Sequence, residues 1–106
     1  MADKKHVLAE VAQNLREPFK HIIVGQVDDY CAYLVRIEGA YLFHHHPRDE
    51  MYLVLEGEIT VDYDDGHTVQ VGAGESLVVR AGEKHRSRSS EGALVLMFKA
   101  RDLFAE

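Results

Sequence analysis

Three consecutive histidines, 44–46, are the residues in this 106-residue chain whose types and spacing best suit chemistry. Side chains alternate along an extended segment, so His44 and His46 are expected on one face. Glu50 follows at the start of the next segment, within reach through a tight turn. His85 comes later, after a second turn over residues 81–84. Three imidazoles and a carboxylate predict a site for a divalent transition metal at His44, His46, Glu50 and His85.

The donor types limit the metal without identifying it. Imidazole suits Zn, Fe, Ni and Cu, and the carboxylate of Glu50 extends the range to Mn. A structural zinc site would be closed and usually built from cysteines, whereas this chain has only Cys31. Four protein ligands in an octahedral arrangement would leave open positions for water, dioxygen or a bidentate substrate. The alternative is that these histidines are polar surface residues that merely cluster.

Two kinds of element must position these residues. Apolar residues at three- and four-residue spacing predict an N-terminal amphipathic helix, with Asp3 as N-cap and its end near Arg16, before Pro18. Beyond it, turn residues such as Asp65-Gly66 separate short strands and favour an all-β sandwich or barrel. The expected strands are 21–27, 30–38, 40–46, 50–55, 58–63, 67–71, 75–80, 85–89 and 93–99.

Segments 51–55 and 94–98 are apolar at every position, yet a barrel interior buries one face of a strand. The N-terminal helix or a second copy of the chain must cover the other face, which favours a homodimer. Segment 59–63 alternates instead, so Thr60 and Asp62 are expected on a solvated face.

Composition excludes several classes of protein. Twelve basic against 18 acidic residues give a net charge of −6, which argues against a nucleic-acid partner. No stretch approaches the roughly 20 apolar residues of a membrane span. The first residues lack the apolar run of a signal peptide, and the single Cys31 fits a reducing compartment. We therefore expect a cytoplasmic protein without a membrane partner.

The site residues also resemble a known family. The pattern His44-x-His46-x-x-x-Glu50-x-x-x-x-x-x-Gly57 is similar to the first motif of the cupins. Gly74 and the pattern Arg80-x-Gly82-x-x-His85 resemble the second motif, with Arg80 where proline is usual and Ser89 where asparagine is common. The resemblance covers about residues 20–99.

The resemblance implies a single cupin domain over residues 1–106, with a jelly-roll β-barrel (a double-stranded β-helix) and a short N-terminal helix. Residues 1–17 would form the helix and lead-in, 20–99 the barrel and 100–106 a short tail. It also implies metal ligands at His44, His46, Glu50 and His85, a pocket inside the barrel and frequent dimerisation. It implies no single reaction, because cupins include dioxygenases, isomerases, epimerases, decarboxylases, sugar-binding regulatory domains and storage proteins.

Two further residues are candidates for binding a small-molecule ligand. By parity, Tyr52 shares a face with Glu50, and Ser87 shares a face with His85. A tyrosine near a metal can orient a substrate oxygen or act as an acid, but the favoured interpretation is that Tyr52 simply packs in the barrel. His6, His21 and His67 lack ligand spacing and are left out of the site.

Three functions stay open at this point. The first is a small-molecule metalloenzyme, dioxygenase- or isomerase-like, using one divalent metal ion per chain. The second is a module that binds or senses a small ligand without turnover. The third is a metal that mainly stabilises the fold.

Overall fold

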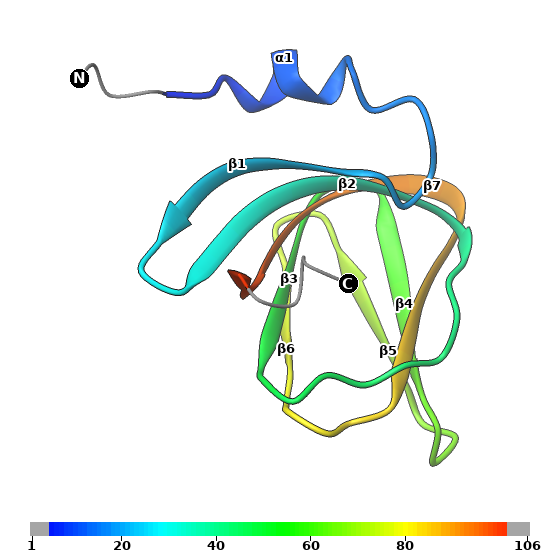
Figure 1. Cartoon of the computed structure of the whole chain (residues 1–106). Coiled ribbons are helices and arrows are strands. Elements are labelled where there is room, and N and C mark those ends of the chain that lie inside the picture. Colours follow the sequence, from blue (N-terminus) through cyan, green and yellow to red (C-terminus); the bar gives the residue numbers. More distant parts are fainter. Residues whose placement is uncertain (1–4, 102–106) are drawn as a thin grey trace.

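One short helix and seven strands make up the described part of the chain, residues 5–101 of a computed structural model (Figure 1). Every strand pairing in it is antiparallel, and the sheet runs in the order β1-β2-β7-β3-β6, with β4 joining β5 to β7. No helix within residues 5–101 is long and apolar enough to cross a membrane. The elements are α1 (Leu8–Ala12), β1 (His21–Val27), β2 (Tyr30–Ala40), β3 (Glu50–Glu56), β4 (Glu58–Tyr63), β5 (Thr68–Gly72), β6 (Ser76–Val79) and β7 (His85–Ala100).

Strand β7 joins the parts of the barrel. Its first residues pair with β4 and with the end of β2, and its later residues pair with the rest of β2 and with β3. The sequence predicted two strands here, 85–89 and 93–99, but the structure joins them. Gly92 lies in the connection with φ +93°, which lets the strand change direction without ending. A Cβ at Gly57 would lie 2.6 Å from the Gly92 carbonyl oxygen. The close approach of the two backbones at Gly57 and Gly92 therefore requires glycine at position 57.

The barrel interior is filled mainly by the inward residues of β2, β3, β4 and β7, which alternate with outward ones as the sequence predicted, and β5 and β6 add one buried residue each. This core confirms the all-β fold class. Its buried members are Tyr33, Val35, Ile37, Tyr52, Val54, Ile59, Val61, Tyr63, Val71, Val79, Ala93, Val95 and Met97.

Helix α1 covers part of the outer face of the sheet (Figure 1). The N-terminal helix was one of the two covers that the sequence analysis expected for this face. Leu15, just after the helix, is buried with Leu34 and Leu94, and α1 residues pack around them. The helix is shorter than predicted, because after Ala12 the backbone bonds become i to i−3 turns that end at Leu15. Its expected N-cap, Asp3, lies outside the described residues.

The predicted strand 40–46 was wrong beyond Ala40. Residues 41–49 form a loop, in which only His44 makes an isolated bridge, to His85. From Ala40 to His44 the chain advances four residues while the paired β7 residues, Arg88 to His85, advance three, which makes the pairing irregular. Beyond His44 the loop has no residue of β7 to pair with, because β7 begins at His85. The Gly82 N–H donates to the His46 carbonyl at 2.8 Å instead.

The prediction of a solvated Asp62 was also wrong. The Asp62 side chain is buried because Arg86 and Arg88, on the neighbouring β7, close over it. Arg86 Nε donates to Asp62 Oδ2 at 2.9 Å, and Arg88 Nε donates to the same oxygen at 2.7 Å. The Arg86 guanidinium also lies 4.8 Å from the centre of the Phe43 ring, so this cluster holds the 41–49 loop against β7.

Replacing Asp62 by Asn should lower the free energy of unfolding by about 1–2 kcal/mol at pH 7, since the two arginines lose their anionic acceptor. The hydrogen bonds from Arg88 hold the pKa of Asp62 below its ordinary value of 3.8. A lowered pKa contributes stability above the unfolded-state pKa and loses it as pH falls through the folded-state value. Urea unfolding of both proteins should therefore show a difference at pH 7 that shrinks below about pH 4. A difference that does not vary with pH would contradict the charged role of Asp62.

Candidate metal centre

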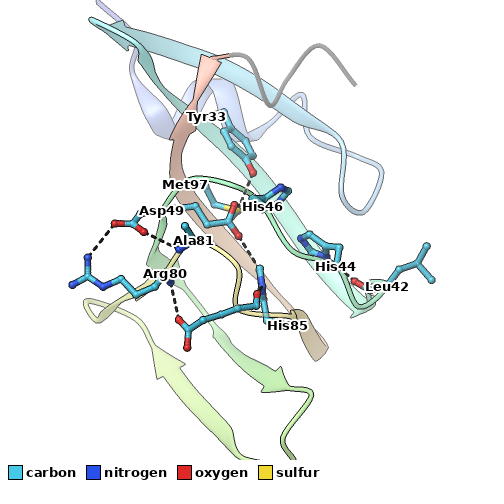
Figure 2. A network of polar contacts seen from close by, with 11 residues as sticks. Tyr33, Leu42, His44, His46, Asp49, Arg80, Ala81, His85 and Met97 are labelled. Carbon is cyan, nitrogen blue, oxygen red and sulfur yellow. Dashed lines mark hydrogen bonds and ion pairs between the residues drawn. The ribbon is translucent and has the colours of Figure 1, made fainter.

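The four predicted ligand residues come from three places in the fold. His44 and His46 lie on the 41–49 loop, Glu50 begins β3, and His85 begins β7 (Figure 2). One ligand atom each of His44, Glu50 and His85 lies within 4.8 Å of the others. His46 lies beside this group, with its ring centre 4.8 Å from that of His44 and 6.1 Å from that of His85.

The contact between His85 and Glu50 is the closest in the cluster. His85 Nε2 lies 2.8 Å from Glu50 Oε1, and the two side chains are only 1% and 2% exposed. His85 Nδ1 lies 2.8 Å from the Glu83 carbonyl oxygen, which can only accept, so Nδ1 carries a proton. In neutral imidazole, Nε2 is then an acceptor facing another acceptor. A shared proton or a cation must therefore lie at this contact.

The other two histidines present their second ring nitrogen to the same group. His44 Nδ1 donates to the Leu42 carbonyl at 2.8 Å, which leaves Nε2 as an electron-pair donor. His46 Nε2 lies 3.5 Å from Glu50 Oε2, the carboxylate oxygen that His85 does not contact. A backbone carbonyl on one ring nitrogen is a common way of fixing the tautomer of a metal-binding histidine.

The pKa of His85 shifts in the opposite direction from those of His44 and His46. Burial lowers the pKa of His44 and of His46, which favours the neutral form that a metal requires. Burial alone would lower the pKa of His85, but its hydrogen bonds to Glu50 and to the Glu83 carbonyl raise it above the ordinary value. Burial would raise the pKa of Glu50, but the hydrogen bond from His85 holds it low. Glu50 therefore stands as a carboxylate beside His85.

The turn that carries His85 is tied to the residue before Glu50. Asp49 accepts hydrogen bonds from the Ala81 N–H at 2.8 Å and from the Arg80 guanidinium at 3.1 Å. The Arg80 N–H donates to the Glu83 carboxylate at 2.8 Å (Figure 2). The sequence interpretation gave Asp49 no role. No motif marks Asp49, and its partners lie more than 30 residues away.

A cavity of about 440 Å³ opens from this cluster into the barrel. Tyr52 and Ser87 line it, on the faces that parity predicted. Burial raises the pKa of Tyr52 well above its ordinary value. Tyr52 is therefore a neutral hydroxyl group in the cavity wall.

Sequence reasoning missed further residues of the wall, among them His21, Tyr33, Met97 and Lys99. His21 was left out because it has no ligand spacing, and the structure places it at the cavity on β1. Tyr33, Met97 and Lys99 belong to predicted strands. Met97 and Lys99 are two positions apart on one strand, so they lie on the same face. Only the pairing of β2 with β7 shows that these faces turn towards the histidines.

Comparison with known proteins gives consistent results. The family model "Cupin domain" matches residues 34–98. The uncharacterized protein YdbB of Bacillus subtilis (strain 168) is 37% identical over 90 residues, which cover 84% of this chain and 79% of that protein.

Solved structures share the fold. A cupin-2 domain protein from Shewanella frigidimarina NCIMB 400 superposes with a TM-score of 0.86 at 23% identity, covering 91% of this chain and 94% of the other. Hydroquinone 1,2-dioxygenase PnpCD, solved with Cd²⁺ and 4-hydroxybenzonitrile, superposes with a TM-score of 0.74 at 22% identity. The match covers 86% of this chain and 69% of that chain. The family match spans more than half of the chain, and it includes all four clustered residues as well as Tyr52 and Ser87 on the cavity wall. The chain therefore belongs to the cupin domain family.

Proposed function

We propose that the chain binds one divalent transition metal ion through His44, His46, Glu50 and His85 and acts on a small molecule in the adjoining cavity. The observation that carries this proposal is the buried contact between His85 Nε2 and Glu50 Oε1, at 2.8 Å. Two electron-pair donors at that distance require a positive charge, and a metal ion supplies one without protonating either group. Zn, Fe, Mn, Ni and Cu all suit this mixture of imidazole and carboxylate.

The most consistent activity is that of a small-molecule metalloenzyme, dioxygenase- or isomerase-like. Bound metal would supply Lewis acidity, or dioxygen chemistry if it is redox-active. The chain's own residues would do the rest: Ser87 and the neutral Tyr52 hydroxyl would orient a polar group of the substrate. The apolar walls of the barrel would exclude water from the reacting atoms.

The alternative function is a module that binds or senses a small ligand without turnover. The third possibility is a metal that mainly stabilises the fold. Turnover separates the first two, because an enzyme loses rate when a ligand residue is changed. A structural metal would instead show mainly as lost thermal stability after chelation. The proposed cytoplasmic location rests on the single free cysteine, Cys31, which fits a reducing compartment.

The metal proposal is tested by titrating the metal-free protein with Co²⁺ and following its visible absorption. His44→Ala, His46→Ala and His85→Ala should each weaken binding by at least about tenfold, since each removes a donor. His67→Ala is the matched control, because His67 is exposed on the β4–β5 turn, where it contacts Asp65. If His46→Ala binds Co²⁺ as tightly as the control variant, the assignment of His46 fails.

Asp49→Ala should weaken Co²⁺ binding by about tenfold while leaving the ligands intact, because it releases the turn that carries His85. Asp64→Ala removes an exposed carboxylate from the β4–β5 turn and serves as the control. Equal affinities of the two variants would show that the Asp49 contacts do not position the site.

We also propose a homodimer that covers the apolar surface beyond α1. Met51 pairs with Val78 on one side and with Phe98 on the other, so the three side chains form a row on the outer face. Met51 and Phe98 are half-buried, and Val78 is 38% exposed. None of them belongs to the cluster under the helix.

Met51→Lys should convert such a dimer to a monomer, because a lysine in that row would lose its hydration in the interface. Sedimentation velocity on the wild type and on the variant measures this directly. Val27→Lys is the control and should stay dimeric. Val27 is an exposed apolar residue at the end of β1. A monomeric wild type would contradict the proposed dimer.

A further inference from the structure

The orientation of the His44 ring depends on one backbone carbonyl. His44 Nδ1 donates to the Leu42 carbonyl oxygen at 2.8 Å, and Figure 2 shows the two residues next to each other. A hydrogen bond at one ring nitrogen decides which nitrogen of a neutral imidazole carries the proton. The bond to Leu42 therefore leaves Nε2 as the electron-pair donor. The peptide group between Leu42 and Phe43, which contains this carbonyl, must stay in place for the ring to do so.

Backbone hydrogen bonds attach the loop to β7 on either side of this peptide group. The Tyr41 N–H donates to a β7 carbonyl at 3.0 Å, and the N–H groups of His44 and His85 each donate to the other residue's carbonyl at 2.9 Å. Leu42 itself is 76% exposed, so its side chain adds little packing at this point. The position of the peptide group therefore depends on the side chain that follows it, Phe43.

The Phe43 ring makes a contact of its own with β7. The Arg86 guanidinium lies 4.8 Å from the centre of this ring, which is a cation–π distance. Phe43 directly precedes His44, and Arg86 directly follows His85, so this contact lies next to the bridge between the two histidines. Arg86 Nε also donates to Asp62 Oδ2 at 2.9 Å, and this bond restricts where the guanidinium can lie.

Arg88 shows what the contact with Phe43 adds. Arg88 binds the same carboxylate, with Nε 2.7 Å from Asp62 Oδ2 and Nη2 3.2 Å from Oδ1. Both arginines are partly exposed and bound to one buried acid, so they contribute comparable ion pairs to the barrel. Among the described residues, only Arg86 lies over the Phe43 ring. A comparison of the two arginines therefore isolates the contact with the loop.

We propose that Arg86 is a positioning residue of the metal centre. Through the Phe43 ring it holds the peptide group whose carbonyl fixes His44, with Nε2 left as the donor to the ion. This inference rests on the proposed metal centre and extends it to a residue that is not itself a ligand. Without the contact, the Leu42 carbonyl is free to move, and the His44 ring then places its proton on either nitrogen.

Co²⁺ titration in competition with a chelator tests the inference on two matched variants, Arg86→Met and Arg88→Met. Arg86→Met should bind Co²⁺ about two- to fivefold more weakly than wild type, as expected for a partly exposed cation–π contact. Arg88→Met is the control, and it should lose stability but keep the wild-type affinity. Phe43→Leu should match Arg86→Met, whereas Phe43→Tyr should keep the affinity because it retains an aromatic face.

NMR of the imidazole nitrogens in the metal-free proteins gives a second readout, which a loss of stability alone does not change. The spectra are recorded at a pH where the imidazoles are neutral, and the His44 signals are assigned by comparison with His44→Ala. Wild type and Arg88→Met should carry the His44 proton on Nδ1. Arg86→Met and Phe43→Leu should show a mixture of both tautomers.

Either of two results overturns the inference. One is an Arg86→Met protein that binds Co²⁺ as tightly as Arg88→Met, and the other is an Arg86→Met protein in which His44 keeps the wild-type tautomer. A wild type that binds no Co²⁺ contradicts the metal centre instead. The tautomer comparison in the metal-free proteins then still decides whether Arg86 positions His44.

Discussion

The proposed site depends on the buried contact between Glu50 and His85. Both groups are withdrawn from water, and the proton on His85 Nδ1 is committed to the Glu83 carbonyl. An ionised carboxylate in that position is unfavourable without a compensating charge. A proton on His85 can compensate, and so can a metal ion held by the neighbouring imidazoles. Burial lowers the pKa of His44 and of His46, so both neutral imidazoles are available as donors to the proposed ion.

The fold brings this contact together from distant segments. Glu50 begins β3 and pairs with Val79 at the end of β6, and the turn after β6 leads to His85 at the start of β7. Their preceding loops are bonded to each other, since Asp49 accepts from Ala81 and the Gly82 N–H donates to the His46 carbonyl. A ligand cluster built across two loops has a geometry that depends on the barrel being closed. Metal binding and folding should therefore be thermodynamically linked.

Three of the proposed ligands could be predicted from the sequence because their spacing is local. His44, His46 and Glu50 fall within one turn and its flanks, so alternation and turn signals suffice to group them. Asp62 and Lys99 were not readable in the same way. Asp62 is buried by two arginines from a strand 24 and 26 residues later, and Lys99 enters the cavity through the register of β3 with β7. Such properties follow from strand pairing, which periodicity alone does not determine.

Anomalous X-ray scattering from crystals of the untagged protein, purified without chelators, tests the central claim most directly. Data collected above and below the absorption edge of each candidate metal would locate the ion and identify it. The account predicts one strong peak per chain among His44, His46, Glu50 and His85, about 2.0–2.3 Å from the donor atoms. A density map without such a peak, with Glu50 and His85 in direct contact after metal has been added in excess, would contradict it.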